Sequence, residues 1–291
     1  METGDLLKKV RKIEIKSRNL SQNIFSGMYH SAYKGRGVIF SEVREYLPGD
    51  DVRDIDWNVT ARQNRPFVKV YEEDRELTMM LLIDVSASEW FGSTSDSKRD
   101  VMAEIGATLA FSSIDNNDKV GVIFFSDKIE KFIPPKKGKG HILLIIREIL
   151  NLQPTSRGTD INKALEFLNS AVKRKCTAFL ISDFIDNSDY YQNMSIANRK
   201  HEIAVLQVYD ERDTNLPDVG LLRLKDLESG EERWVDTSLK SVRKIYERGW
   251  YEREQKLYSI TSRCGVDRVS IRTDEDYVKA LLEMFRRRAL R

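Results

Sequence analysis

The sequence predicts an α/β protein with a doubly wound, mostly parallel sheet that has one antiparallel edge strand. An N-terminal segment of irregular and β structure is expected to pack on this sheet. Short continuous apolar runs, such as residues 79–83 and 203–208, have the length of strands buried on both faces. Helical periods separate these runs, which is typical of parallel strands joined by helical crossovers. The runs at 120–125 and 128–133 are too close together for such a crossover, so the latter predicts the antiparallel strand.

The remaining elements follow from apolar spacing. Helices are predicted where apolar residues recur every three or four positions, as Val101, Ile105 and Leu109 do. Glu228-Ser229-Gly230 is a hairpin signal between two short strands. In chain order, strands are predicted at residues 79–83, 120–125, 128–133, 178–181, 203–208, 221–226, 232–236 and 268–271. Helices are predicted at residues 98–113, 141–150, 161–173, 190–199, 238–262 and 275–288.

The residues before this alternating pattern have a different character. They are rich in Gly, Asp, Arg and Tyr and contain only short strand-like pieces, such as 38–40 and 67–71. We therefore expect two parts. Residues 1–76 form an N-terminal segment with a short helix and irregular or β structure, and residues 77–291 form the sheet domain.

Composition excludes several function classes. The chain has 48 Lys and Arg against 46 Asp and Glu, and this near-neutral balance gives no support for nucleic-acid or membrane-surface binding. Its 2 Cys are far apart, which excludes a zinc knuckle and a disulfide scaffold, and 3 scattered His disfavour a His-based metal site. No apolar stretch is long enough to span a membrane, so we expect a cytoplasmic protein without an integral membrane segment.

Oxygen-bearing side chains lie where strands of the predicted sheet end. Asp84, Ser86 and Ser88 follow the first buried strand directly, Thr159 precedes a helix, and Asp183 ends the strand at 178–181. In a doubly wound sheet the carboxyl ends of the strands open into the functional crevice. Carboxylates and hydroxyls are hard oxygen donors, so these five residues predict a site for Mg²⁺ (or Mn²⁺).

Each donor also has an ordinary structural explanation. Asp84 can cap the following turn, Thr159 or Asp160 can be a helix N-cap, and Asp183 can be an acid in a surface loop. The combination favours a metal site, because every donor falls on the same predicted edge of the sheet.

The pattern Asp84-x-Ser86-x-Ser88, with Thr159 and Asp183, resembles the metal-ion-dependent adhesion site of von Willebrand factor A domains. The resemblance implies a divalent cation at the end of a parallel sheet, ligated directly by hydroxyls and directly or through water by acids. It also implies that a carboxylate of a partner protein completes the coordination. One departure is that Glu89-Trp90 follows the serines, where related proteins often carry Met, and this alters the charge near the metal.

The N-terminal segment adds a more specific resemblance, because its residues are similar to the signature of family fifty-eight of the domains of unknown function. Members look like bacterial cytoplasmic proteins that act as adaptors or co-chaperones of MoxR-class AAA+ ATPases. The resemblance therefore implies such an ATPase, or its client, as the partner. The residues that carry it and that we expect to be structural are Arg44, Tyr46, Gly49, Asp50, Asp51, Arg53, Asp56, Trp57 and Arg62.

Physically, the acids of this segment do not form a calcium loop. A loop starting at Asp54 has Val59 where a Gly is needed and Arg65 where a bidentate Glu is needed. The interleaved Arg residues predict an ion-pair and cap network that locks the segment onto the sheet domain, with Trp57 as a buried anchor. A partner-binding surface is the alternative.

Two classes of function remain. The first is a non-catalytic, metal-dependent protein-interaction module, which needs no general base or nucleophile. The second is a Mg²⁺-dependent phosphohydrolase of haloacid-dehalogenase type with Asp84 as nucleophile, although Ser86 stands where such enzymes need an acid. A purely structural domain with an empty site is a third possibility.

Overall fold

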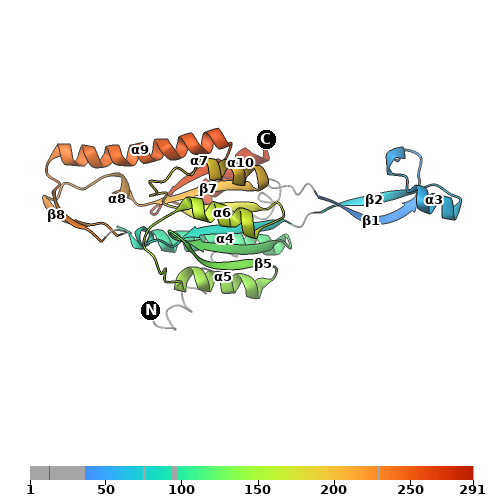
Figure 1. The fold of residues 1–291 in the computed structure, drawn as a ribbon, viewed down its shortest axis with the longest axis horizontal. Helices are drawn as coiled ribbons and strands as arrows, with labels where there is room; N and C mark the ends of the chain where they lie inside the picture. The colour runs from blue at the N-terminus through green and yellow to red at the C-terminus, as the bar shows by residue number, and fades with distance from the viewer. Residues whose placement is uncertain (1–12, 14–36, 75–76, 94–96, 228–229, 291) are drawn as a thin grey trace. The chain divides into compact units, whose positions relative to one another are not determined.

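The structure is a computed structural model that describes residues 13, 37–74, 77–93, 97–227 and 230–290 (Figure 1). One compact unit lies within residues 33–76, and a second contains the residues from Leu77 onward. The predicted N-terminal segment of residues 1–76 therefore lies partly outside the described residues. Its boundary and its packing onto the sheet domain stay predictions.

The second unit is built on a six-stranded sheet with the order β10-β7-β6-β3-β4-β5. All neighbouring strands are parallel except β5, which pairs antiparallel with β4. The strands are β3 (Thr78–Asp84), β4 (Lys119–Phe125), β5 (Ile129–Lys136), β6 (Thr177–Ser182), β7 (Glu202–Tyr209) and β10 (Asp267–Arg272). The predicted fold class is confirmed, including its antiparallel edge strand.

Helices cover both faces of this sheet (Figure 1). Met80 and Leu82 of β3 belong to a core that includes residues of α6, α7 and α9. The alternate residues Leu81 and Ile83 face the other way, toward Gly106 of α4, and α5 packs there as well. The helices are α4 (Lys98–Asp115), α5 (Lys139–Asn151), α6 (Ile161–Ala171), α7 (Tyr191–Lys200), α9 (Lys240–Cys264) and α10 (Tyr277–Ala289). β3 is fully buried on both faces, as its continuous apolar sequence predicts.

The strand order places a topological switch point between β3 and β6. From β3 the chain moves through α4 to β4 on one side, and it later returns to β6 on the other side. The carboxyl ends of β3 and β6 therefore border the crevice where α/β sheets bind ligands. Asp84 ends β3, and Asp183 directly follows β6.

A short excursion follows β7. The helix α8 (Glu211–Thr214) leads to a separate antiparallel hairpin, β8 (Leu221–Lys225) and β9 (Glu232–Asp236), before α9 begins. The predicted hairpin is confirmed, whereas the sequence analysis did not predict α8, which is only one turn long.

Gly121 of β4 provides a test of sheet packing. Gly121 lies where the pairing register between β4 and β5 shifts. A Cβ atom at this position would lie 2.9 Å from both Ile133 O and Pro135 N. Because these are backbone atoms, Gly121→Ala is expected to lower the free energy of unfolding by about 1–3 kcal/mol. Gly140→Ala is the control, since a Cβ there meets nothing within 4 Å. Equal stability of the two variants in urea unfolding would show that β5 is not held this closely.

The first unit is a hairpin of β1 (Gly37–Glu45) and β2 (Phe67–Asp74), with a 3-10 turn (Val52–Asp54) and α3 (Trp57–Gln63) between the strands. Arg44 forms a two-pronged ion pair with Asp50, with N–O distances of 2.8 and 2.7 Å. Asp51 caps the 3-10 turn, and Asp56 caps α3 through the backbone N–H groups of its first turn. The Arg44 pair holds the pKa of Asp50 below its ordinary value.

These contacts are the kind of ion-pair and cap network that the sequence predicted within this segment. Within this unit the side chain of Trp57 is 67% exposed, so its role as an anchor against the sheet domain stays a prediction. Trp57 is the first residue of a short helix that lies outside the two-stranded sheet, so no apolar layer of this unit covers it. The side chains of Arg53 and Arg62 form no ion pair among the described residues.

Within the described part of the chain, no helix combines the length and apolar character that crossing a bilayer requires.

Candidate metal centre

The candidate centre is built from loops that leave β3 and β6 side by side. Ile83 pairs with Ile181 across these parallel strands, so Asp84 and Asp183 leave the sheet at the same edge. Asp84 and Asp183 are 1% and 2% exposed. A carboxylate buried this deeply needs hydrogen bonds or an opposite charge nearby.

The Asp84 carboxylate is fixed by two donors. Its Oδ1 accepts from the backbone N–H of Ser86 at 2.9 Å, and its Oδ2 accepts from Ser182 Oγ at 2.6 Å. The hydroxyls of Ser86 and Ser88 lie 3.1 Å apart, and both residues are buried. Three of the predicted oxygen donors therefore converge, and the two hydroxyls lie next to each other.

Thr159 lies on a loop that is tied to the serine loop through the backbone. Ala87 N–H donates to the carbonyl of Arg157 at 3.0 Å, and Asp160 N–H donates to Ser126 O at 3.0 Å. Asp160 is the N-cap of α6 and its side chain accepts from Lys163 N–H, so the capping role belongs to Asp160 and not to Thr159. Thr159 is half-buried beside the serine loop, although its coordination of a metal stays a prediction.

Glu89 adds a third buried carboxylate. One carboxylate oxygen from each of Asp84, Glu89 and Asp183 lies within 4.8 Å of the other two. Glu89 Oε1 accepts from Asp183 N–H at 3.2 Å, whereas its Oε2 is buried without a hydrogen-bond partner among the described residues. A buried oxygen without a partner is costly, and a cation would satisfy it. The side chains therefore fit a hard divalent ion.

A lysine also enters this cluster. Lys98, the first residue of α4, is 1% exposed and its Nζ lies 2.6 Å from Asp183 Oδ2 and 3.2 Å from Asp213 Oδ2. Asp213 belongs to α8 and is held by its capping box with Asp210. The other oxygen of Asp183 accepts from Ile185 N–H, so both Asp183 oxygens are engaged. Lys98 therefore neutralises Asp183.

Burial and mutual repulsion perturb the acids of this cluster despite the nearby ammonium. Burial, and then the charge of Asp183, raises the pKa of Asp84 to about 7. Burial, Asp183 and Asp84 raise the pKa of Glu89 well above its ordinary value. Burial alone would lower the pKa of Lys98, but Asp183, Glu89 and Asp213 together raise it. Lys98 thus stays charged, while Asp84 and Glu89 take up protons more readily than exposed carboxyl groups do.

The turn after β6 is strained. Phe184 is 4% exposed and has a φ of 59°, a conformation that bulky residues rarely adopt. Its N–H donates to Ser182 Oγ at 2.9 Å, the same hydroxyl that donates to Asp84. The tight turn holds Asp183 against β3, and such strain is typical of functional sites.

Sequence reasoning missed Glu89 as a member of the cluster, and Lys98 and Asp213 altogether. Two signals were present. Glu89 lies in the same loop as the serines, and a lysine at the first position of a helix is disfavoured by the helix dipole. An unusual cation at a helix N-terminus indicates a neighbouring acid that outweighs the dipole.

These features define a class: a doubly wound α/β domain with a buried acidic cluster and paired serine hydroxyls at its switch point. The family model described as "Protein of unknown function DUF58" matches residues 42–256, and the chain belongs to this family. The uncharacterized protein Rv1480 of Mycobacterium tuberculosis is 30% identical over 273 residues, which are 92% of this chain and 85% of that protein. The uncharacterized protein YeaD of Bacillus subtilis is 24% identical over 111 residues, which are 38% of this chain and 26% of that protein.

Among solved structures, the conserved hypothetical protein BatB from Bacteroides thetaiotaomicron has a TM-score of 0.49 and 16% identity, covering 74% of this chain and 100% of that chain. The SpRpn10 VWA domain has a TM-score of 0.40 and 12% identity, covering 73% of this chain and 95% of that chain. At these TM-scores the similarity to solved structures adds nothing to the fold that the strand order already shows. The case for the candidate metal centre therefore depends on the geometry of its own residues.

Proposed function

We propose that this chain is a non-catalytic, divalent-metal-dependent protein-interaction module. Mg²⁺ (or Mn²⁺) is held by Asp84, Ser86, Ser88 and Thr159, with Asp183 in support. A carboxylate of a partner protein completes the coordination. The favoured partner is a MoxR-class AAA+ ATPase or its client, as the resemblance of the N-terminal segment implies.

The single observation that carries the proposal is the buried acidic cluster beside the two serine hydroxyls. Lys98 forms its ion pairs with Asp183 and Asp213, and no ion pair of Asp84 or Glu89 occurs among the described residues. A divalent ion brings positive charge to this cluster, and Glu89 Oε2, which has no hydrogen-bond partner among the described residues, is available as one of its ligands. Oxygen donors of this kind suit Mg²⁺ and Mn²⁺ better than softer metals.

The same donor set favours binding over catalysis. The hydroxyls of Ser86, Ser88 and Thr159 are neutral and cancel none of the cation's charge, so an open coordination position attracts an acidic side chain from outside. In a partly dried interface this attraction is stronger than in water. No activated nucleophile is required for such a contact.

Chelation tests the proposal. A purified MoxR-class ATPase of the source organism is expected to bind this protein in a buffer that contains Mg²⁺. Addition of EDTA, or the substitution Asp84→Ala, is expected to weaken this association at least about tenfold. The acid control is Glu247→Gln, because Glu247 is exposed on α9. Association that is unchanged by both EDTA and Asp84→Ala would contradict the metal-dependent module.

The phosphohydrolase alternative has a separate readout. Turnover of a generic phosphate ester that requires Mg²⁺ and disappears in Asp84→Asn would favour it over the interaction module. The sequence does not favour this alternative, because Ser86 stands where such enzymes need a second acid.

A further inference from the structure

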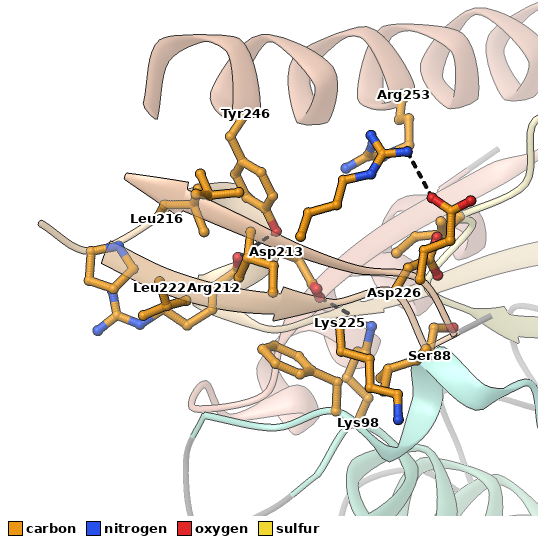
Figure 2. Close-up of a pocket in the computed structure, with 18 of the residues that line it drawn as sticks. Ser88, Lys98, Arg212, Asp213, Leu216, Leu222, Lys225, Asp226, Tyr246 and Arg253 are labelled. Atoms are coloured by element: carbon orange, nitrogen blue, oxygen red, sulfur yellow. Dashed lines mark hydrogen bonds and ion pairs between the residues drawn. The ribbon is translucent and has the colours of Figure 1, made fainter. Parts of the chain in front are cut away.

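A cavity of about 730 Å³ opens beside the metal centre (Figure 2). The β8–β9 hairpin, α8 and α9 line it, and Ser88 and Lys98 form its boundary with the metal centre. Figure 2 shows Tyr246 and Arg253 reaching from α9 toward the cavity. A volume of this size is typical of pockets that bind ligands.

The hairpin presents an apolar face to this cavity. Leu222 and Leu224 line the cavity and are half-buried. The first residue of β8, Leu221, points to the opposite face of the hairpin and is 65% exposed. Val235 pairs with Leu222 across the strands, and Leu216 adds a buried side chain after α8. Alternation along the strands therefore provides an apolar floor of several side chains.

The charged part of the lining has an excess of positive charge. It contains five basic side chains and three carboxylates. Asp213 is paired with Lys98 at 3.2 Å and Glu231 with Arg233 at 2.8 Å. Two of the basic side chains also pair with acids outside the lining, Lys98 with Asp183 and Lys225 with Glu232. Arg212 is half-buried, and its guanidinium has no carboxylate partner among the described residues. An acidic occupant complements this lining.

The hairpin also favours a peptide over a small molecule. β8 and β9 pair with each other only, so each has an outer edge with no strand partner within the described ranges. An extended peptide can add its backbone to such an edge while its alternate side chains enter pockets.

Lys98 connects the cavity to the centre. Its ammonium contacts Asp183 on the cluster side and Asp213 on the cavity side. An occupant that lies against Arg212 and the apolar floor therefore extends toward Ser88 and the proposed cation.

We propose that this cavity binds an extended acidic and apolar segment of the partner protein, with an apolar side chain on Leu222 and Leu224 and a carboxylate on Arg212. The segment's next acidic side chain reaches the cation. This last contact rests on the proposed function, whereas the contacts with the hairpin and Arg212 do not need the metal.

The probe is a fluorescein-labelled peptide of alternating Glu and Leu, measured by fluorescence anisotropy against the full chain. A peptide of alternating Lys and Leu is the charge control, and octanoate is the small-molecule competitor. In Mg²⁺ we expect the acidic peptide to bind with a dissociation constant below about 1 mM. Arg212→Glu and Leu224→Asp are each expected to weaken binding at least about tenfold.

Lys173→Glu is the matched control, because Lys173 is exposed after α6, does not line the cavity, and is expected to leave binding unchanged. Thermal melts identify any variant that fails to fold, and Leu224→Ala then replaces Leu224→Asp. Equal binding of the basic peptide, no binding of the acidic peptide, or an equal loss of affinity in Lys173→Glu would overturn the proposal. Displacement of the labelled peptide by octanoate, at concentrations at which unlabelled acidic peptide does not displace it, would also overturn it.

EDTA separates the two proposals. Loss of affinity in Arg212→Glu that persists in EDTA supports the cavity even if the metal centre fails. Binding that depends on Mg²⁺ and Asp84 but not on Arg212 or Leu224 leaves the metal centre standing and overturns the cavity.

Discussion

Replacing Lys98 by methionine is expected to lower the free energy of unfolding of the metal-free protein by about 3–5 kcal/mol, the usual cost of removing one partner from a buried ion pair. The ammonium is 1% exposed and lies between Asp183 and Asp213. Without it, Asp183 would be left beside Asp84 and Glu89 with no positive charge at either oxygen. The measurement is urea unfolding in EDTA.

Addition of Mg²⁺ distinguishes this explanation from simple loss of packing. The ion supplies positive charge to the same cluster, so it is expected to stabilise Lys98→Met more than the wild type. Lys173→Met serves as the control, because Lys173 is exposed after α6. A Lys98→Met protein as stable as the wild type, or one that gains no more from Mg²⁺, would mean that Lys98 does not balance the acidic cluster.

Asp84→Asn is expected to weaken Mg²⁺ binding at least about a hundredfold, because it removes a charged ligand from the ion. The metal-free variant is nevertheless expected to be at least as stable as the wild type. The pKa of Asp84 is raised to about 7, chiefly by burial, so the folded state binds a proton that the unfolded state has already released. The wild type therefore loses stability as the pH rises from about 4 to about 7, and Asp84→Asn removes this part of the loss.

Titration calorimetry and urea unfolding at several pH values measure the two effects. Glu89→Gln is the companion variant, since it keeps the shape of the side chain and removes its charge. This variant is expected to bind Mg²⁺ about tenfold more weakly or worse, as substitutions around metal ligands do. An Asp84→Asn protein that binds Mg²⁺ like the wild type, or that has the wild-type slope of stability against pH, would contradict the role given to Asp84.

Much of the sheet domain could be predicted because its strands are continuous apolar runs separated by helical periods. The runs at 79–83 and 178–181 became β3 and β6, which are neighbours as the switch-point interpretation required. That adjacency is what brought Asp84 and Asp183 together.

The rest depends on contacts between residues far apart in the sequence. Lys98 and Asp183 are separated by 85 positions, and no local pattern shows that a helix begins with its lysine inside the sheet crevice. Asp213 lies on a single turn of helix, too short to produce a periodic signal. Whether Trp57 is buried against the sheet domain cannot be read from its apolar character, since burial depends on which layers cover a segment.

The most direct test of the metal centre is a crystal structure of the protein grown with Mn²⁺, with the ion located by its anomalous scattering. We expect a single peak at the carboxyl ends of β3 and β6, about 2.1 Å from oxygens of Asp84, Ser86 and Ser88, with Lys98 still bound to Asp183. A map without a peak there, in which the Lys98 ammonium occupies the space between the three carboxylates, would contradict the account.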